Sequence, residues 1–174
     1  YKKGRDIEGG RMDAERLSMK YTLSDAIAKF EDEVDSTKAL KKGTMTSYRT
    51  HLRWWRNQLG DYKLFNITPQ IITDSKNKLS GVKNRKRKSS TVNRYLTTLS
   101  SVYTYIVKDW KWANNNPILL VKKGKESKIK ARFLSLNEMK RLLSACKKEK
   151  RKPLYLIVWM ALFTGARKNE ILTA

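Results

Sequence analysis

Apolar side chains recur at steps of three and four residues over residues 90–110, and this pattern limits the possible fold more than any other feature of the sequence. The spacing places them on one face of a helix of about five turns. Ser89 or Ser90 is expected to cap the first turn of this helix. The apolar positions are Val92, Tyr95, Leu96, Leu99, Val102, Tyr103, Ile106, Val107 and Trp110.

Three shorter segments share this periodicity, at residues 22–35, 44–59 and 68–80. Thr22 and Asp25 have capping-box spacing, and Thr68 followed by proline is a typical helix start. The sequence therefore predicts a mainly α protein in which residues 21–121 form one compact helical bundle. Residues 1–20 are polar, mixed in charge and expected to be partly helical.

A second unit is expected at residues 133–174, after a basic linker at residues 122–132. Ser135 and Glu138 form another capping-box pattern, and Pro153 begins a segment that is apolar on nearly every side. Such a helix belongs inside a domain, but little chain is left to cover it. Because the first residue is also not methionine, we expect this sequence to be a piece of a longer protein.

The chain carries 39 Lys and Arg residues against 16 Asp and Glu residues, a formal net charge of +23. A cation of this size attracts polyanions, of which nucleic acids carry the densest regular charge. One cysteine, Cys146, and one histidine, His51, cannot form a disulfide or a zinc site, so we expect no metal and no cofactor. No segment has the length of a membrane span, and the chain is expected in the cytoplasm of a bacterium, encoded there or by a phage or mobile element.

Two basic segments are the main candidates for contact with nucleic acid. A loop before the long helix is expected to bind phosphate together with the amides of the first helical turn. The six cations of the linker suit contact with nucleic acid; a disordered basic spacer is the other interpretation, and the two are not exclusive. On exposed helix faces, Arg49, Arg53, Asn93 and Arg94 are candidates for reading bases, and His51 is expected to face solvent or phosphate. The remaining candidates are Lys83, Arg85, Lys86, Arg87, Lys88 and Ser90 of the loop and Lys122, Lys123, Lys125, Lys128 and Lys130 of the linker.

Residues 164–172 read Thr-Gly-Ala-Arg-Lys-Asn-Glu-Ile-Leu directly after the apolar segment. The pattern T-G-x-R-x-x-E-[IL] in this position resembles the first catalytic box of the tyrosine recombinases, or phage integrases. Residues 132–138, Arg-Phe-Leu-Ser-Leu-Asn-Glu, are similar to the start of the catalytic domain in that family. The resemblance covers residues 22–174, and the order of bundle, basic linker and motif agrees with it.

The resemblance implies a SAM-like core-binding domain at residues 21–121 and the helical start of an α+β catalytic domain at residues 133–174. It implies that Arg167 grips the scissile phosphate, for which a guanidinium offers paired donors to two oxygens. Glu170 would support that arginine, or would form only an ordinary salt bridge with Lys168 or another neighbour. Residues 1–20 would follow an arm-type DNA-binding domain.

In this family a tyrosine attacks the phosphate, forms a 3′-phosphotyrosyl link and is released by the 5′ hydroxyl of a partner strand. The second arginine and the nucleophilic tyrosine are expected downstream of Ala174, so the chain alone should not cut DNA. The whole protein is expected to act as a tetramer on double-stranded DNA, and this chain to be a monomer off DNA.

Two other classes remain open. A non-enzymatic helical DNA-binding regulator would explain the charge and the helices but not residues 164–172. An RNA-binding or ribosomal protein would bind structured RNA as well as duplex DNA, with aromatic side chains exposed on a sheet or in loops.

Overall fold

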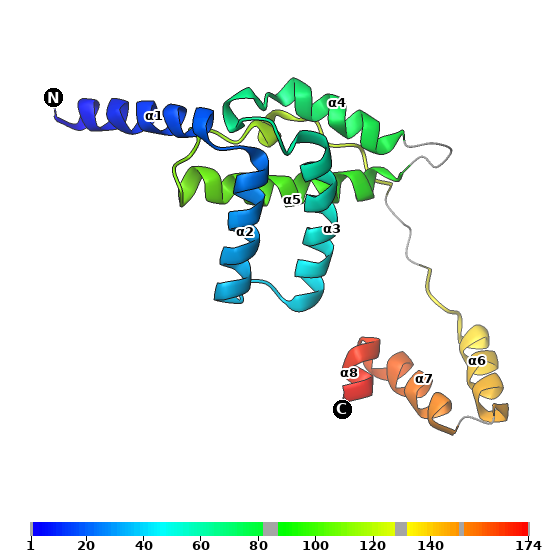
Figure 1. The fold of residues 1–174 in the computed structure, drawn as a ribbon. Coiled ribbons are helices and arrows are strands. Elements are labelled where there is room, and N and C mark those ends of the chain that lie inside the picture. Colours follow the sequence, from blue (N-terminus) through cyan, green and yellow to red (C-terminus); the bar gives the residue numbers. More distant parts are fainter. Residues whose placement is uncertain (1, 82–86, 128–131, 150–151, 174) are drawn as a thin grey trace. The chain divides into compact units, whose positions relative to one another are not determined.

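The computed structural model describes residues 2–81, 87–127, 132–149 and 152–173. It is mainly α-helical, as predicted, and divides into two compact units, Tyr1–Ser127 and Lys128–Ala174 (Figure 1). In the described residues, the extended pairing is limited to one isolated bridge, between Thr22 and Lys63.

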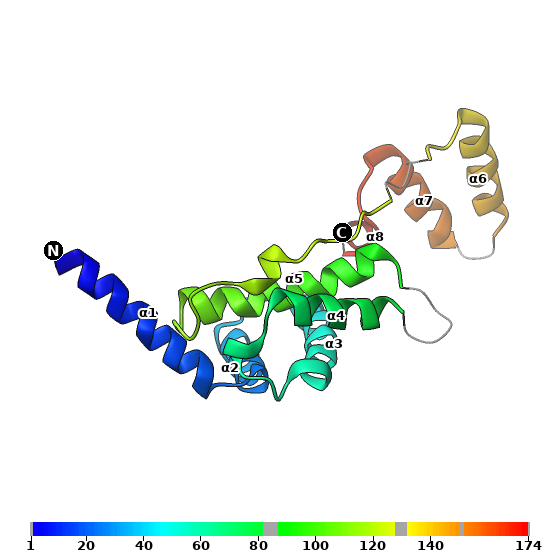
Figure 2. The same cartoon turned by 90° about the horizontal axis from the view of Figure 1, so that it is seen from above.

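The first unit is built around its longest helix, α5. This helix contacts α2, α3, α4 and the short 3₁₀-helix η2, while α2 and α3 pack against each other as a hairpin (Figure 1). After η2 the chain runs back along α5 toward the first turn of that helix (Figure 2). The elements are α1 (Lys2–Lys20), α2 (Leu23–Thr37), α3 (Lys42–Leu59), η1 (Leu64–Asn66), α4 (Pro69–Ser80), α5 (Ser89–Lys108) and η2 (Pro117–Leu120).

Two helices of this unit begin where the sequence predicts. At α2 the Thr22 amide donates to the Asp25 carboxylate over 2.8 Å, and the Asp25 amide donates to the Thr22 hydroxyl over 3.2 Å. At α4 the Thr68 hydroxyl accepts from the Ile71 amide, with proline as the first helical residue. Both capping predictions are confirmed.

The predicted serine cap of α5 is wrong. Ser89 is already the first helical residue, and Lys88 holds the cap position without any side-chain cap bond. Its carbonyl accepts from the amides of Thr91 and Val92, at 3.0 and 3.2 Å, so the helix begins one residue earlier than a serine cap would allow. Among the residues that the structure describes, no side chain therefore closes the amide end of α5.

The core of the first unit follows the predicted apolar positions. Trp55 is fully buried, and its indole nitrogen donates to the Tyr95 carbonyl over 2.9 Å, which satisfies the polar atom inside the core. Trp54, Trp110 and Trp112 are half-buried and pack against this core. These four tryptophans thus serve packing. The other large fully buried side chains include Phe30, Leu23, Ile27, Leu52, Ile72, Leu79, Leu96, Leu99 and Ile106.

Residues 2–20 form one helix, which is more than the partial helix predicted there. The end of α1 packs on η1, and the Lys63 ammonium donates to the Lys20 carbonyl over 2.7 Å. Ala14 and Ser18 are buried in this contact region.

The second unit contains α6 (Leu136–Lys148), α7 (Lys152–Thr164) and α8 (Lys168–Thr173). The predicted capping box at α6 is confirmed, with the Ser135 amide donating to Glu138 over 2.9 Å. The apolar helix α7 packs mainly with α6 and α8. Its side chains Leu156, Trp159 and Phe163 are 57%, 40% and 65% exposed, in line with the expectation that little of this chain covers it.

Candidate nucleic-acid interface

The chain turns sharply between α7 and α8. Gly165 adopts φ 65°, in the left-handed region that favours glycine, and its amide donates to the Ala161 carbonyl over 3.1 Å. The Thr164 hydroxyl donates to the Met160 carbonyl and accepts from the Ala166 amide. This turn ends α7 and places Arg167 just before α8.

Arg167 and Glu170 contact each other in two ways. The Arg167 amide donates to one carboxylate oxygen of Glu170 over 2.8 Å, and the Arg167 guanidinium donates to the other over 3.2 Å. The Arg167 side chain nevertheless remains 86% exposed. Glu170 therefore closes the first turn of α8 and fixes one side of the guanidinium, leaving most of that side chain open to a ligand. The salt bridge of Glu170 is with Arg167 itself, which is compatible with both predicted roles.

The motif at residues 132–138 also contains an ion pair. Arg132 forms an ion pair with Glu138, the residue that caps α6. Hydrogen bonds from the Ser135 amide and hydroxyl, with a further bond from Arg132, lower the pKa of Glu138. The carboxylate is charged at neutral pH and holds the start of α6.

The basic loop before α5 is described only at its end. Lys83, Arg85 and Lys86 lie outside the described residues. Arg87 is half-buried, with its guanidinium carbon 5.6 Å from the centre of the Tyr95 ring. Lys88 is exposed at the uncapped start of α5, with Ser90 in the first turn, so a cation and the helix amides do lie together there.

The contact between α3 and α5 holds polar side chains that local periodicity does not place. The His51 Nδ1 atom lies 2.8 Å from the Thr98 hydroxyl, and its ring centre lies 4.1 Å from that of Tyr95. Burial, and to a lesser extent the charge of Arg94, lowers the pKa of His51. One ring nitrogen of His51 is thereby engaged by α5 while the side chain stays half-buried, so the expected solvent or phosphate contact stays a prediction. Arg53 and Arg94 are exposed.

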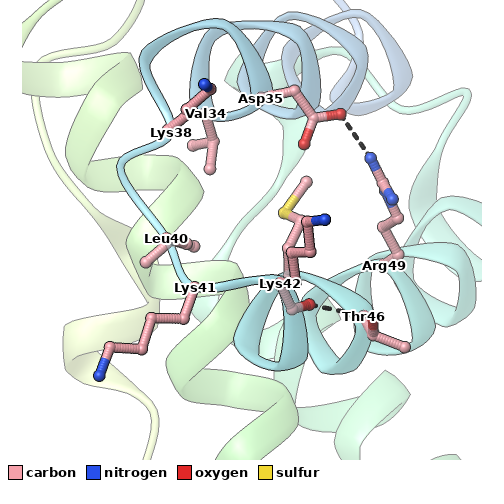
Figure 3. A pocket seen from close by; sticks show the side chains of 9 residues that line it. Val34, Asp35, Lys38, Leu40, Lys41, Lys42, Thr46 and Arg49 are labelled. Carbon is pink, nitrogen blue, oxygen red and sulfur yellow. Dashed lines mark hydrogen bonds and ion pairs between the residues drawn. The ribbon is translucent and has the colours of Figure 1, made fainter.

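Arg49 is engaged elsewhere. Its guanidinium forms an ion pair with Asp35 of α2, and Figure 3 shows the two side chains pointing toward each other. They stand at the rim of a cavity of about 620 Å³ between the end of α2 and the start of α3. Arg49 therefore has an acidic partner within the chain. The cavity is lined also by Val34, Lys38, Leu40, Lys41, Lys42, Met45 and Thr46.

The first half of the linker is held against the bundle. Lys122, Lys123 and Lys125 are exposed, whereas Lys128 and Lys130 lie outside the described residues. Asn93 is only 7% exposed and is hydrogen-bonded to linker residues, so its predicted role in reading bases is wrong.

Lys76, which no sequence pattern singled out, donates from its ammonium to the Lys122 carbonyl over 3.1 Å. Its partner is 46 residues away in the chain, which is why no local signal marks it. Of the predicted linker at residues 122–132, the part up to residue 126 is therefore hydrogen-bonded to the bundle, and the division between the two units falls after Ser127.

Within the described residues, no helix is long and apolar enough to cross a membrane. The same residues contain no group of three or more His, Cys, Asp or Glu side chains that could hold a metal ion.

The chain is similar in sequence to integrases and to a tyrosine recombinase. It is 34% identical over 119 residues to the integrase of Haemophilus phage HP1, which covers 66% of this chain and 35% of that protein. It is 34% identical over 83 residues to a putative integrase of Pseudomonas phage Pf1, covering 48% of the chain and 25% of the relative. It is 24% identical over 151 residues to the tyrosine recombinase XerD of Rickettsia bellii, covering 84% of the chain and 48% of the relative.

The chain thus spans a quarter to a half of the length of these relatives. No family model and no solved structure matches it. The matches to phage integrases and to a tyrosine recombinase agree with the motif at residues 164–172 and with its place after an apolar helix. The similarity to integrases and tyrosine recombinases supports the tyrosine recombinase, or phage integrase, family for this chain.

Proposed function

We propose that this chain is the DNA-gripping part of a site-specific recombinase, with duplex DNA as its partner. The first unit would bind the duplex, and the second would supply the first phosphate-binding arginine of the catalytic site. The similarity to integrases and tyrosine recombinases and the net charge of +23 support this assignment.

The observation that carries the proposal is the presentation of Arg167. The turn at Gly165 places its side chain at the surface, and Glu170 fixes one edge of the guanidinium while leaving it 86% exposed. Attack on a phosphodiester produces a five-coordinate phosphorane with additional negative charge. A guanidinium with open donors can bind two of its oxygens at once, which a lysine ammonium cannot do with the same geometry.

Phosphates of the duplex would be held mainly at the first turn of α5. Arg87, Lys88 and Arg94 lie at or near that turn, and its amides are not closed by a side-chain cap. Lys83, Arg85 and Lys86 of the preceding loop, and the lysines of the linker, would add further phosphate contacts. Arg53 remains a candidate for base contact, whereas Arg49 would first have to leave Asp35.

In the whole protein, a tyrosine beyond this chain would attack the scissile phosphate. The bond between its phenolic oxygen and phosphorus would form as the bond to the 5′ oxygen breaks, and that oxygen would leave as a hydroxyl. The 5′ hydroxyl of the partner strand would then reverse the step, so neither ATP nor a metal is required.

Tyr103 is an unsuitable nucleophile, since it is 1% exposed and burial raises the pKa of its hydroxyl. Tyr95 is buried as well. We propose that the chain alone does not cleave DNA and is a monomer in its absence, while the whole protein acts as a tetramer on two duplexes.

Competition binding tests the proposal. A labelled duplex of about 25 base pairs should bind the chain, and unlabelled structured RNA of equal length should displace it much less effectively than unlabelled duplex. Equal displacement by RNA would instead support an RNA-binding protein.

For the whole protein, reading the source gene beyond the codon for Ala174 should reveal an H-x-x-R box and a late tyrosine. A reading frame that ends there would leave a DNA-binding regulator and contradict the recombinase.

A further inference from the structure

Asn93 connects α5 to the linker through both ends of its amide. Its nitrogen donates to the Gly124 carbonyl over 2.9 Å and to the Glu126 carboxylate over 2.7 Å. Its oxygen accepts from the Gly124 amide over 2.9 Å. An asparagine that is 7% exposed and makes three hydrogen bonds to one distant segment has little capacity left for any other partner.

Gly124 lies against the first turn of α5, where a larger residue would be in tight contact. A Cβ atom added to Gly124 would lie 3.0 Å from the Ser89 Cβ and 3.1 Å from the Ser89 hydroxyl. Glycine therefore favours the close contact that brings the linker backbone within reach of Asn93, since a Cβ atom there would press on Ser89. Val121, buried at 6% exposure, and the bond from Lys76 to the Lys122 carbonyl hold the segment just before this contact.

These contacts fix the backbone of residues 121–126 on the bundle, while the side chains of Lys122, Lys123 and Lys125 remain exposed. The three lysines are thereby kept on the same unit as the uncapped first turn of α5, instead of being free to move with a flexible spacer. A flexible basic segment loses conformational entropy when it binds, and a segment already fixed loses less.

We propose that Asn93 is a positioning residue for DNA binding, which anchors the linker so that its lysines form one preorganised phosphate-binding surface with the start of α5. The inference rests on the proposed DNA-binding function. It assigns to Asn93 and Gly124 no contact with DNA, only the placement of the residues that contact it.

Two variants release the linker by different means. Asn93→Ala removes all three hydrogen bonds, whereas Gly124→Ala keeps Asn93 and pushes the linker away from Ser89. Asn114→Ala is a matched control, because it also removes a long-range bond from an asparagine amide to a backbone carbonyl, that of Arg11, away from the linker. Thermal unfolding of each variant establishes that the bundle still folds.

Hydrogen exchange at the Gly124 amide measures the anchoring directly. We expect exchange to be about tenfold faster or more in Asn93→Ala and in Gly124→Ala, and unchanged in Asn114→Ala. Exchange in Asn93→Ala equal to that in the wild type would overturn the anchoring.

DNA affinity across a salt series measures its consequence. In Asn93→Ala we expect affinity for the duplex to fall about threefold to tenfold, since the linker must now be ordered on binding. The slope of log affinity against log salt should become shallower by up to about 0.9 for each phosphate that the linker lysines no longer bind. The double variant should bind about as weakly as either single variant, because both changes free the same segment.

Each remaining result has a definite meaning. Unchanged DNA affinity in a variant whose Gly124 amide exchanges fast would overturn this inference while leaving the proposed function intact. Failure of the wild-type chain to bind duplex DNA would overturn the proposed function, and this inference with it. Glu126→Gln, which keeps an acceptor for Asn93 but removes the acidic charge, should retain slow exchange at Gly124. Fast exchange in that variant would contradict an anchor made chiefly by Asn93 and Gly124.

Discussion

At the scale of single residues, the contact between Arg167 and Glu170 orients the guanidinium and adds little to stability. The pair is exposed, and exposed ion pairs contribute little to stability. Its value lies in orientation, since the carboxylate holds the guanidinium from one side and also accepts from the Arg167 amide at the start of α8. A change at Arg167 should therefore affect chemistry at a phosphate much more than folding.

Replacing this arginine in the whole recombinase tests that expectation. Arg167→Lys should lower the rate of DNA cleavage by about 100-fold or more, because the paired donors to the developing negative charge are removed. Affinity for DNA should change less than about threefold. Arg132→Lys, which alters another exposed arginine paired with a glutamate, is the control. An Arg167→Lys enzyme with near-normal cleavage would remove Arg167 from the catalytic site.

A second residue-scale prediction concerns the cap of α2. Hydrogen bonds from the Thr22 amide and hydroxyl lower the pKa of Asp25 below its ordinary value of 3.8. A lowered pKa in the folded state means that the carboxylate stabilises the protein at neutral pH, and that this contribution disappears as the pH falls from about 3.8 through the lower folded value.

Asp25→Asn should therefore reduce the free energy of unfolding at pH 7 and have almost no effect near pH 2, as measured by denaturant unfolding at both pH values. Asp32→Asn removes the same charge from α2 away from the cap and serves as the control. A difference between wild type and Asp25→Asn that is as large at pH 2 as at pH 7 would show that the charge of Asp25 is not what stabilises the cap.

At the scale of elements, α5 supplies both the centre of the core and the start of the proposed DNA surface. Leu99 is fully buried in its middle, while Arg94 is exposed in its first half. One helix therefore joins the core to the proposed binding surface, and the two contributions can be measured separately on it.

Leu99→Ala should reduce the free energy of unfolding by about 3 kcal/mol, because it removes buried methyl groups and leaves a cavity. Leu119→Ala, at a position 77% exposed in η2, should change it by less than about 0.5 kcal/mol. Denaturant unfolding compares the two. Equal small effects would mean that α5 is not packed as the structure has it.

The binding role of α5 is tested by charge changes at its two ends. Arg94→Gln should weaken DNA binding and reduce the salt slope by about 0.9, the effect of one phosphate contact. Lys108→Gln removes the same charge about 20 Å further along the same helix and should leave the slope unchanged. Equal effects of the two variants would show that net charge alone, and not the start of α5, determines binding.

At the scale of the whole molecule, the net charge of +23 sets how binding responds to salt. If six or more phosphates are neutralised, raising monovalent salt from 50 to 200 mM should lower duplex affinity about 1,000-fold. Fluorescence anisotropy at four or five salt concentrations gives the slope. A slope near zero would contradict a binding surface built from lysines and arginines.

The sequence by itself determined the helices and the apolar core. Caps such as Thr22 with Asp25 and Ser135 with Glu138 act within three residues, and apolar periodicity acts within a few turns, so both can be recognised locally. The serine cap predicted for α5 was wrong because the Lys88 carbonyl accepts hydrogen bonds from the amides of Thr91 and Val92. No pattern of side chains in the sequence indicates this backbone contact.

Only the tertiary structure decided which polar side chains remain available to a ligand. Arg49, Asn93 and His51 all lie on polar positions of helices, yet their partners are 14, 31 and 47 residues away in the chain. Asp35, Gly124 and Thr98 reach them only because the helices and the linker pack together. Hydrogen bonding and charge pairing depend on distance in space, so the sequence proposed the candidates and the packing of the bundle selected among them.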